Sequence, residues 1–191
     1  MSTPDVYRVM TVCTGNICRS PMAEIVLRDR LEAAGLSGRV VVDSSGVSDE
    51  EHGNPIDPRA RTVLLAHGYP VDGEHRARQV TAADVRSHHL VLAMTAAHAR
   101  ALRRLAASAG SDGAGGAVRM YRSFDPDAPD VRPGESEHLL DVDDPWYGGP
   151  ENFETCLVEI EAAADGIVDL AREELEARPG RVAGNRSAEG A

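Results

Sequence analysis

A thiol, a guanidinium and a hydroxyl lie close together near the start of the chain. Cys13 is followed six positions later by Arg19 and then directly by Ser20, with Gly15 and Asn16 between them. A thiolate can attack phosphorus, and a planar arginine can hold two phosphoryl oxygens at once. Glycine and asparagine tolerate the left-handed backbone of a tight turn, and a serine hydroxyl can donate a hydrogen bond to a thiolate. The segment is typical of a loop that grips a phosphate and attacks it.

The segments on either side of this loop fit a strand and a helix. Residues 6–12 are apolar and β-branched, as expected of a buried strand, and Pro21 suits the first turn of a helix because it has no N–H to leave unpaired. Backbone N–H groups in such a turn converge with the positive end of the helix dipole, which favours a bound phosphate and a thiolate. The expected phosphate-binding residues are Thr14, Gly15, Asn16, Ile17, Cys18 and Ser20.

Five segments, in order along the chain, resemble the bacterial low-molecular-weight protein tyrosine phosphatases. They are residues 12–24, 43–46, 53–59, 75–80 and 144–148, and the resemblance extends to about Arg178. It implies that Cys13 is the nucleophile, that Arg19 clamps the phosphate in the transition state, and that Asp144 is the general acid. It also implies a set of supporting hydrogen bonds that hold the loop, from Asn16, Ser20, Ser44 and His75.

The same resemblance implies an activity and a substrate class. The enzyme would hydrolyse phosphotyrosine in protein substrates through a phosphocysteine intermediate, with no metal or organic cofactor. Trp146 and Tyr147 would stack on the substrate ring. A reversible disulfide between Cys13 and Cys18 is also implied, although Cys18 fits a packed small side chain equally well.

The choice of general acid depends on the resemblance. Asp141, Asp143 and Asp144 compete for this role on composition alone, since three acids in four residues also fit a solvated loop. Pro145 keeps the residue before it extended and stiffens the loop, which suits a positioned acid. The match to Asp-Pro-aromatic-Tyr-Gly makes Asp144 the preferred residue.

Three alternative functions remain open. A protein arginine phosphatase has a similar loop with threonine where this chain has Ile17, and an apolar side chain suits an aromatic ring better than a guanidinium. An arsenate reductase on the same fold needs cysteines in the middle of the chain, but none occurs between Cys18 and Cys156. A catalytically silent phosphate-binding module is disfavoured because Cys13, Arg19 and an Asp-Pro acid are all retained.

One departure from the family concerns specificity. Many members carry an aromatic residue, often tryptophan, where an ungapped count places Glu50, and here Asp49 and Glu51 flank it. One wall of the expected phosphotyrosine pocket is then missing. An acidic rim predicts a preference for substrate peptides with basic flanks.

Composition excludes several function classes. The net charge of −11 and the absence of a basic stripe disfavour nucleic-acid binding. No apolar run is long enough to span a bilayer, and the seven histidines show no metal-ligand spacing. Three cysteines, an odd number, suit a reducing compartment, so we expect a cytoplasmic protein. The oligomeric state is left open.

Strand-like and helical segments alternate along the chain. Strands are expected at residues 6–12, 39–42, 90–93 and 118–120, and helices at 21–34, 58–67, 95–107 and 152–177. This order predicts an α/β fold: a single domain with an open, parallel four-stranded sheet, helices on both faces and the phosphate-binding loop after the first strand. The domain is expected to cover residues 1–178, with a surface loop at 109–116 and a disordered tail at 179–191.

Overall fold

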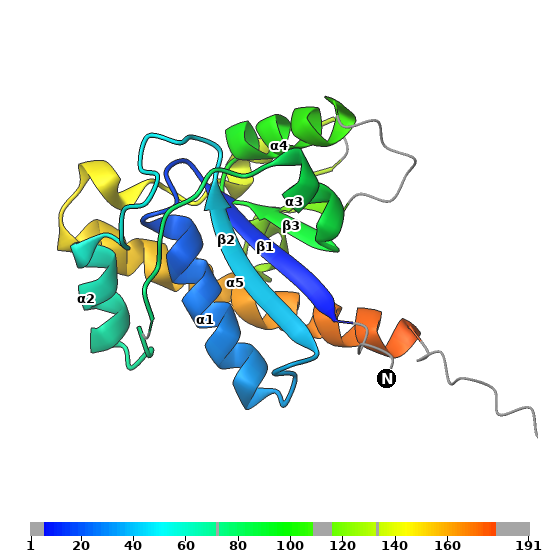
Figure 1. Ribbon diagram of the computed structural model, residues 1–191, viewed down its shortest axis with the longest axis horizontal. Helices are drawn as coiled ribbons and strands as arrows, with labels where there is room; N and C mark the ends of the chain where they lie inside the picture. The colour runs from blue at the N-terminus through cyan, green and yellow to red at the C-terminus, as the bar shows by residue number, and fades with distance from the viewer. Residues whose placement is uncertain (1–5, 72, 109–115, 133, 179–191) are drawn as a thin grey trace, which may run out of the picture.

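A parallel sheet runs through the part of the chain that the structure, a computed structural model, describes: residues 6–71, 73–108, 116–132 and 134–178. Within these residues four strands pair in the order β2-β1-β3-β4 (Figure 1). Their bounds are Tyr7–Cys13 for β1, Val40–Gly46 for β2, Leu90–Ala93 for β3 and Ala117–Met120 for β4. The α-helices are α1 at Arg19–Ala33, α2 at Pro58–Ala66, α3 at Ala82–Ser87, α4 at Ala96–Ser108 and α5 at Pro150–Ala177.

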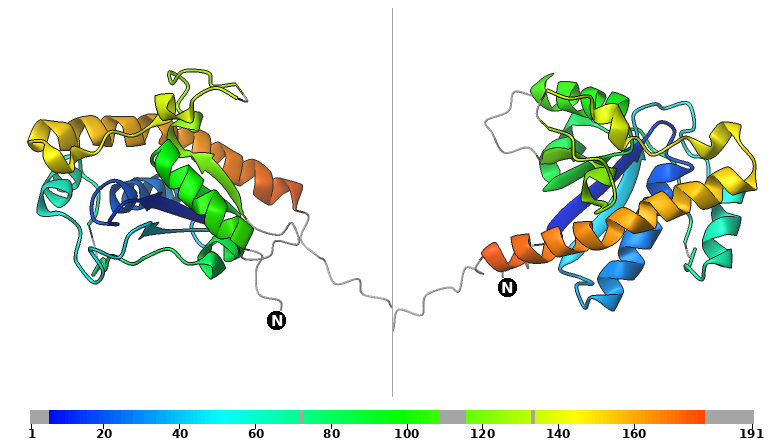
Figure 2. Two further views of the ribbon diagram at one scale, coloured as in Figure 1. Left: turned by 90° about the horizontal axis from the view of Figure 1, so that it is seen from above. Right: turned by 180° about the vertical axis from the view of Figure 1, so that it is seen from behind.

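Helices cover both faces of the sheet. Alternate residues of β1 point to opposite faces and so pack against different helices. Val9 packs into an apolar cluster with Leu27 of α1 and Leu157 of α5. Its neighbour Met10 packs into a second cluster with Leu102 of α4. Figure 2 shows α5 running along one side of the sheet and α4 on the other. The predicted fold class is confirmed.

The strands and helices differ from the expected bounds in a few places. The second strand was predicted to end at residue 42, but β2 continues to Gly46, because its polar end pairs with β1 as far as Cys13. The sequence pattern also missed α3, which is too short to show a helical period. A capping box holds its start, where the Thr81 hydroxyl accepts from the Asp84 N–H and the Asp84 carboxylate accepts from the Thr81 N–H. Short 3₁₀ helices lie at Tyr121–Phe124, Glu137–Leu140 and Pro145–Tyr147.

Two expectations fall outside the described residues. Most of the expected surface loop, residues 109–115, and the whole expected tail, residues 179–191, are not described, so the domain boundary after residue 178 stays a prediction. Across the described residues, no helix combines the length and the apolar character needed to cross a membrane.

The end of β2 lies against the turn that follows β1. Gly46 is opposite Cys13 in the parallel register of β1 and β2. The N–H of Gly46 also donates to the carbonyl of Arg78, in the segment between α2 and α3, at 2.8 Å. A Cβ atom on Gly46 would lie 2.5 Å from the carbonyl oxygen of Thr14 and 3.1 Å from the backbone nitrogen of Asn16. Because both contacts are backbone atoms, no side chain can move aside. Only glycine allows this approach.

Gly46→Ala is therefore expected to destabilise the protein by about 1–3 kcal/mol, because the turn after β1 must shift to make room. Urea unfolding followed by circular dichroism measures the loss. Val41→Ala, at a 40% exposed position of the same strand, is the control and should change the stability much less. An equal loss in the two variants would contradict the close-approach argument.

Candidate active site

The Cys13 loop, residues 13–19, connects the end of β1 to the start of α1. Asn16 has a φ of 61°, the left-handed conformation expected for it, and the chain turns sharply there. The backbone N–H groups of residues 14–18 find no hydrogen-bond acceptor among the described residues. They lie beside the N-terminus of α1, whose dipole adds positive potential. The loop is therefore built to bind an anion with its main chain.

Cys13 lies at the floor of this loop and is 2% exposed. Its sulfur is 3.0 Å from the hydroxyl of Ser20, in the first turn of α1. The Ser20 hydroxyl in turn accepts a hydrogen bond from the side-chain amide of Asn16 at 3.0 Å. The same hydroxyl donates to the carbonyl of Ser45 at 3.2 Å, and its single hydrogen can turn to the sulfur when Cys13 is a thiolate.

Asn16, in the middle of the Cys13 loop, makes hydrogen bonds that stabilise the loop. Its side-chain nitrogen donates to Ser20 and also to the hydroxyl of Ser44 at 2.9 Å, and its side-chain oxygen accepts from the backbone N–H of Arg78 at 3.0 Å. Its carbonyl accepts from Nε2 of His75 at 2.7 Å. The structure thus brings Ser44 and His75 to the loop, at the positions where the sequence predicted supporting residues.

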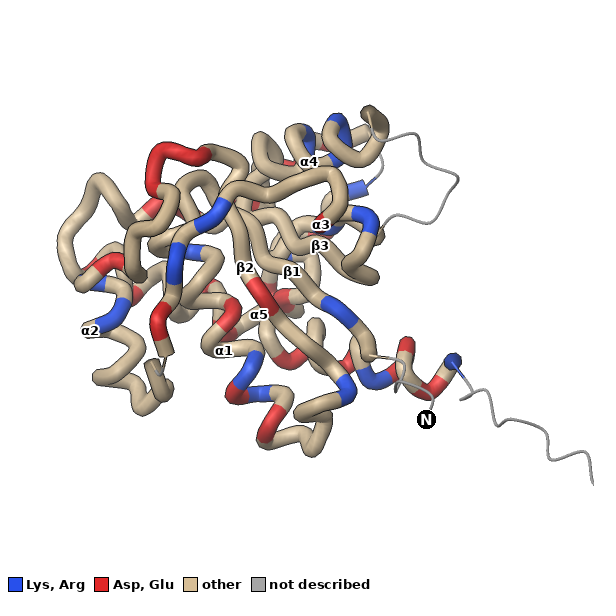
Figure 3. The backbone as a smooth tube through the Cα atoms, viewed as in Figure 1, with Lys and Arg blue, Asp and Glu red and all other residues tan. Residues whose placement is uncertain are grey.

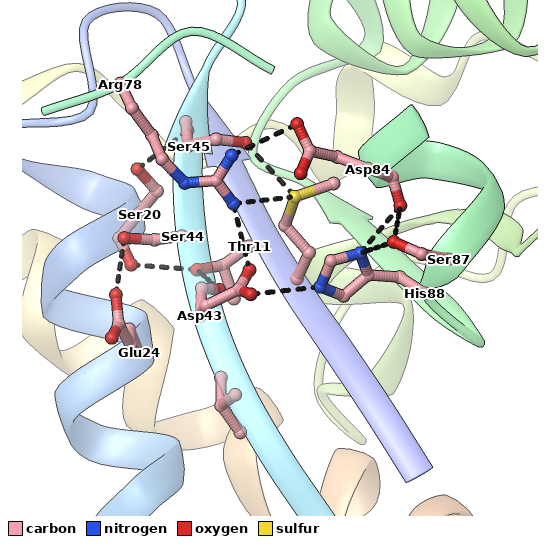
Figure 4. A network of polar contacts seen from close by, with 12 residues as sticks. Thr11, Ser20, Glu24, Asp43, Ser44, Ser45, Arg78, Asp84, Ser87 and His88 are labelled. Atoms are coloured by element: carbon pink, nitrogen blue, oxygen red, sulfur yellow. Dashed lines mark hydrogen bonds and ion pairs between the residues drawn. The ribbon is translucent and has the colours of Figure 1, made fainter. Parts of the chain in front are cut away.

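A polar network continues behind the loop (Figure 4). The hydroxyl of Ser44 donates to the carboxylate of Glu24 on α1 at 2.5 Å. The guanidinium of Arg78 lies between Asp43 of β2, at 3.4 Å, and Asp84 of α3, at 3.1 Å. The groups that hold Asn16 are therefore themselves fixed by residues on three different elements.

Arg19 is 4% exposed, and its guanidinium faces the loop. One terminal nitrogen, Nη1, donates to the carbonyl of Val142 at 3.2 Å. The other, Nη2, donates to the carboxylate of Asp144 at 2.5 Å and to the hydroxyl of Thr14 at 3.3 Å. Its Nε is buried and has no partner within the described residues. A buried donor without a partner is costly, so this nitrogen marks the place of an anionic ligand.

The three clustered acids have separate positions. Asp141 accepts from the N–H of Ala96 at 2.6 Å and so caps the start of α4. Asp144 caps the 3₁₀ helix Pro145–Tyr147, faces Arg19 and lines the cavity above Cys13. Asp143 is exposed and is not part of that cavity lining. Geometry therefore distinguishes the acids, whereas composition did not.

The segment that carries Asp144 is fastened by Arg59 of α2. The guanidinium of Arg59 pairs with Asp57 at 2.9 Å, donates to the carbonyls of Trp146 and Gly148 at 3.2 Å each, and lies 4.6 Å from the ring centre of Phe153. The backbone N–H of Asp57 donates to the carbonyl of Ile17 at 2.8 Å. Asp57 and Arg59 thus connect the Cys13 loop with the Asp144 segment.

A cavity of about 120 Å³ opens above Cys13. Most of the Cys13 loop lines it, together with Trp146 and Tyr147, which are 42% and 90% exposed. Glu50 and Glu51 also line it, and they belong to a continuous acidic stretch of the loop after β2 (Figure 3). The remaining lining residues, all predicted from the sequence, are Thr14, Gly15, Ile17, Cys18, Arg19 and Asp144.

The other two cysteines are buried as well. Burial, reinforced by nearby Asp57, raises the pKa of the Cys18 thiol above its ordinary value, and burial does the same for Cys156. All three cysteines are free, so the disulfide between Cys13 and Cys18 stays a prediction. Within the described chain, no group of three or more His, Cys, Asp or Glu side chains is arranged to hold a metal ion.

Two residues of the site were missed by sequence reasoning. Arg59 belongs to a segment that carried the resemblance, but no role was assigned to it. His98 of α4, whose Nε2 is 2.9 Å from the hydroxyl of Thr14, has no motif around it that indicates a role. Only the packing of α4 beside the loop reveals its contact.

Comparison with known proteins gives consistent matches. The family model described as low molecular weight phosphotyrosine protein phosphatase matches residues 8–178. A low molecular weight protein-tyrosine-phosphatase of Streptomyces coelicolor is 48% identical, covering 90% of this chain and 98% of the relative. Low molecular weight protein-tyrosine phosphatase A of Mycobacterium tuberculosis is 44% identical, covering 90% and 95%. The crystal structure of YfkJ from Bacillus subtilis superposes with a TM-score of 0.74 at 30% identity, covering 88% of this chain and 96% of that one.

These matches span the strand, loop and helix that hold Cys13 and Arg19 as well as the segment that holds Asp144. The similarity in sequence and the similarity in fold point to the same group of proteins. The chain belongs to the low molecular weight phosphotyrosine protein phosphatase family.

Proposed function

We propose that this protein is a protein-tyrosine phosphatase that cleaves phosphotyrosine in protein substrates through a phosphocysteine intermediate. The observation that carries the proposal is the arrangement around one small cavity. It is lined by a buried thiol that has a hydroxyl 3.0 Å away, by a guanidinium whose Nε has no partner among the described residues, and by a carboxyl group. Family membership supports the substrate class, since the relatives from Streptomyces and Mycobacterium are named protein-tyrosine phosphatases.

In the first step, the Cys13 thiolate attacks phosphorus and the bond from phosphorus to the tyrosine oxygen breaks. Arg19 and the loop N–H groups hold the equatorial oxygens, where charge is stabilised in the transition state. Asp144, in its protonated form, donates a proton to the departing oxygen. The Nη2 atom of Arg19 carries two hydrogens, and the one that pairs with Asp144 in this structure turns to the phosphoryl group when substrate enters, while the other stays on Thr14.

In the second step, water attacks the phosphocysteine and inorganic phosphate leaves. Asp144 is now a carboxylate and accepts a proton from that water, so it serves as acid and then as base. Ser20 donates a hydrogen bond to the sulfur as it departs as a thiolate. The cycle returns the enzyme to its starting state and uses no metal or organic cofactor.

The apolar Ile17 in the cavity wall supports phosphotyrosine over phosphoarginine, because an aromatic ring packs against it without leaving a polar group unpaired. We also propose that the protein acts in a reducing compartment such as the cytoplasm. A reduced Cys13 is required for the reaction, and all three thiols of the chain are free.

Phosphate release from matched phosphotyrosine, phosphoarginine and phosphoserine peptides tests the function. Under reducing conditions, phosphotyrosine should be preferred, Cys13→Ser should abolish turnover, and Asp144→Asn should lower kcat/KM by about 10²–10⁴. A preference for phosphoarginine would overturn the substrate assignment but leave the proposed phosphocysteine mechanism in place. Binding of phosphate without turnover of any peptide would indicate a silent binding module.

Arg59→Lys is expected to lower kcat/KM by roughly ten- to a hundredfold. Lysine keeps the positive charge but cannot make all the hydrogen bonds by which the guanidinium holds the segment that carries Asp144. A series of aryl phosphates measures the effect. The loss should shrink as the leaving group becomes more acidic, since such groups need less help from a general acid. Arg61→Lys, an exposed arginine on the same helix, is the matched control. A loss that is the same for every leaving group would contradict a role through Asp144.

Replacing both Glu50 and Glu51 by glutamine should change peptide preference. The acidic side of the cavity attracts basic residues beside phosphotyrosine, so the wild type should favour basic over acidic flanks, and the variant should lose most of that preference. The kcat/KM values of a peptide panel at low and high salt measure it. Salt should weaken the preference, because exposed charges are screened. Equal preference in variant and wild type would rule out these two carboxylates as its source.

A further inference from the structure

Thr14, the residue directly after Cys13, is held from two sides by its hydroxyl. Nη2 of Arg19 donates to its Oγ1 at 3.3 Å, and Nε2 of His98 lies 2.9 Å from the same oxygen. His98 comes from α4, on the opposite face of the sheet from α1, which carries Arg19. The mechanism above gives His98 no role, although the residue is 5% exposed and reaches the Cys13 loop.

The protonation of His98 follows from its surroundings. Burial, together with the positive charge of Arg19, lowers the pKa of His98 to about 4, so its ring is neutral at physiological pH. The other ring nitrogen, Nδ1, is buried and has no partner among the described residues. A buried N–H without an acceptor is rarer in proteins than an acceptor without a donor. The single ring hydrogen is therefore on Nε2, which donates to Thr14.

This tautomer determines the direction of the Thr14 hydroxyl. A hydroxyl oxygen has two acceptor sites and one hydrogen. Arg19 and His98 occupy both acceptor sites, so the hydrogen has to point elsewhere. The Thr14 side chain is exposed and lines the cavity above Cys13. The hydrogen is thus directed into the space that the phosphoryl group would fill.

We propose that the Thr14 hydroxyl donates to a phosphoryl oxygen of the substrate, and that His98 is the positioning residue that keeps this hydroxyl turned toward the cavity. The inference rests on the proposed phosphatase function. Thr14 then adds one side-chain donor to the loop N–H groups and Arg19. His98 acts only through Thr14 and does not touch the substrate.

A double-mutant cycle tests this pair. Thr14→Val keeps the shape of the side chain and removes the hydroxyl, and it should lower kcat/KM for a phosphotyrosine peptide by roughly ten- to a hundredfold, as for loss of a hydrogen bond to a charged group. His98→Asn should lower it by roughly tenfold, since the shorter amide cannot reach Thr14. The double variant should be no slower than Thr14→Val alone, because His98 acts through the hydroxyl.

Conservative variants and a binding readout complete the test. His98→Gln places an amide nitrogen near the position of Nε2 and should recover most of the loss seen in His98→Asn. The inhibition constant of inorganic phosphate should weaken in Thr14→Val and His98→Asn. The matched control is His67→Asn, at an exposed histidine of the segment after α2 that pairs with Glu154. Thermal unfolding of each variant separates loss of fold from loss of activity.

The outcomes distinguish this inference from the proposed function. The inference would be overturned if the losses in kcat/KM multiplied in the double variant, or if Thr14→Val lost no activity. In either case, turnover by the wild type would still support the proposed function. No turnover by the wild type would overturn the function. In that case, direct titration of inorganic phosphate still tests the pair, since unchanged affinity in Thr14→Val would overturn it.

Discussion

The backbone N–H groups of the Cys13 loop, residues 14–18, lie together beside the N-terminus of α1 and have no hydrogen-bond acceptor among the described residues. Groups of like polarity repel one another there, so the loop keeps its shape only if it is held from outside. Asn16 supplies this constraint, with a left-handed backbone and hydrogen bonds that reach α1, β2 and the segment after α2. Gly46 lets β2 approach closely enough for those bonds to form. Cys13, the proposed nucleophile, is thus positioned by contacts of its loop with α1, β2 and the segment after α2.

Charge in the site is strongly local. The protein has a net charge of −11 and contains no lysine, so its overall field repels phosphate. Attraction comes from the N–H groups of the Cys13 loop, the dipole of α1 and the buried Arg19 at the start of that helix. In this structure Asp144 compensates the charge of Arg19. Before substrate enters, this ion pair keeps Asp144 at the cavity above Cys13, where the proposed mechanism needs a proton donor.

Prediction from the sequence was strongest where the residues lie close together in the chain. The strand, the tight turn and the helix start are encoded within residues 6–24, and the structure has them there. Prediction was weaker where a local preference competes with pairing. The polar residues 43–46 are typical of a loop, yet they form the end of β2 because they pair with β1. The choice among Asp141, Asp143 and Asp144 needed family resemblance, because three adjacent acids look alike until their surroundings differ.

The sequence by itself determined the kind of chemistry and the class of fold, since a thiol, a guanidinium and turn-forming residues at close spacing specify a phosphate-gripping loop between a strand and a helix. Tertiary structure decided which distant side chains complete the site. His98 contacts Thr14 across 84 positions, and Arg19 contacts Asp144 across 125. Arg59 reaches the Asp144 segment across 87 positions. Such contacts depend on strand order and helix packing, which bring together residues that no local pattern connects.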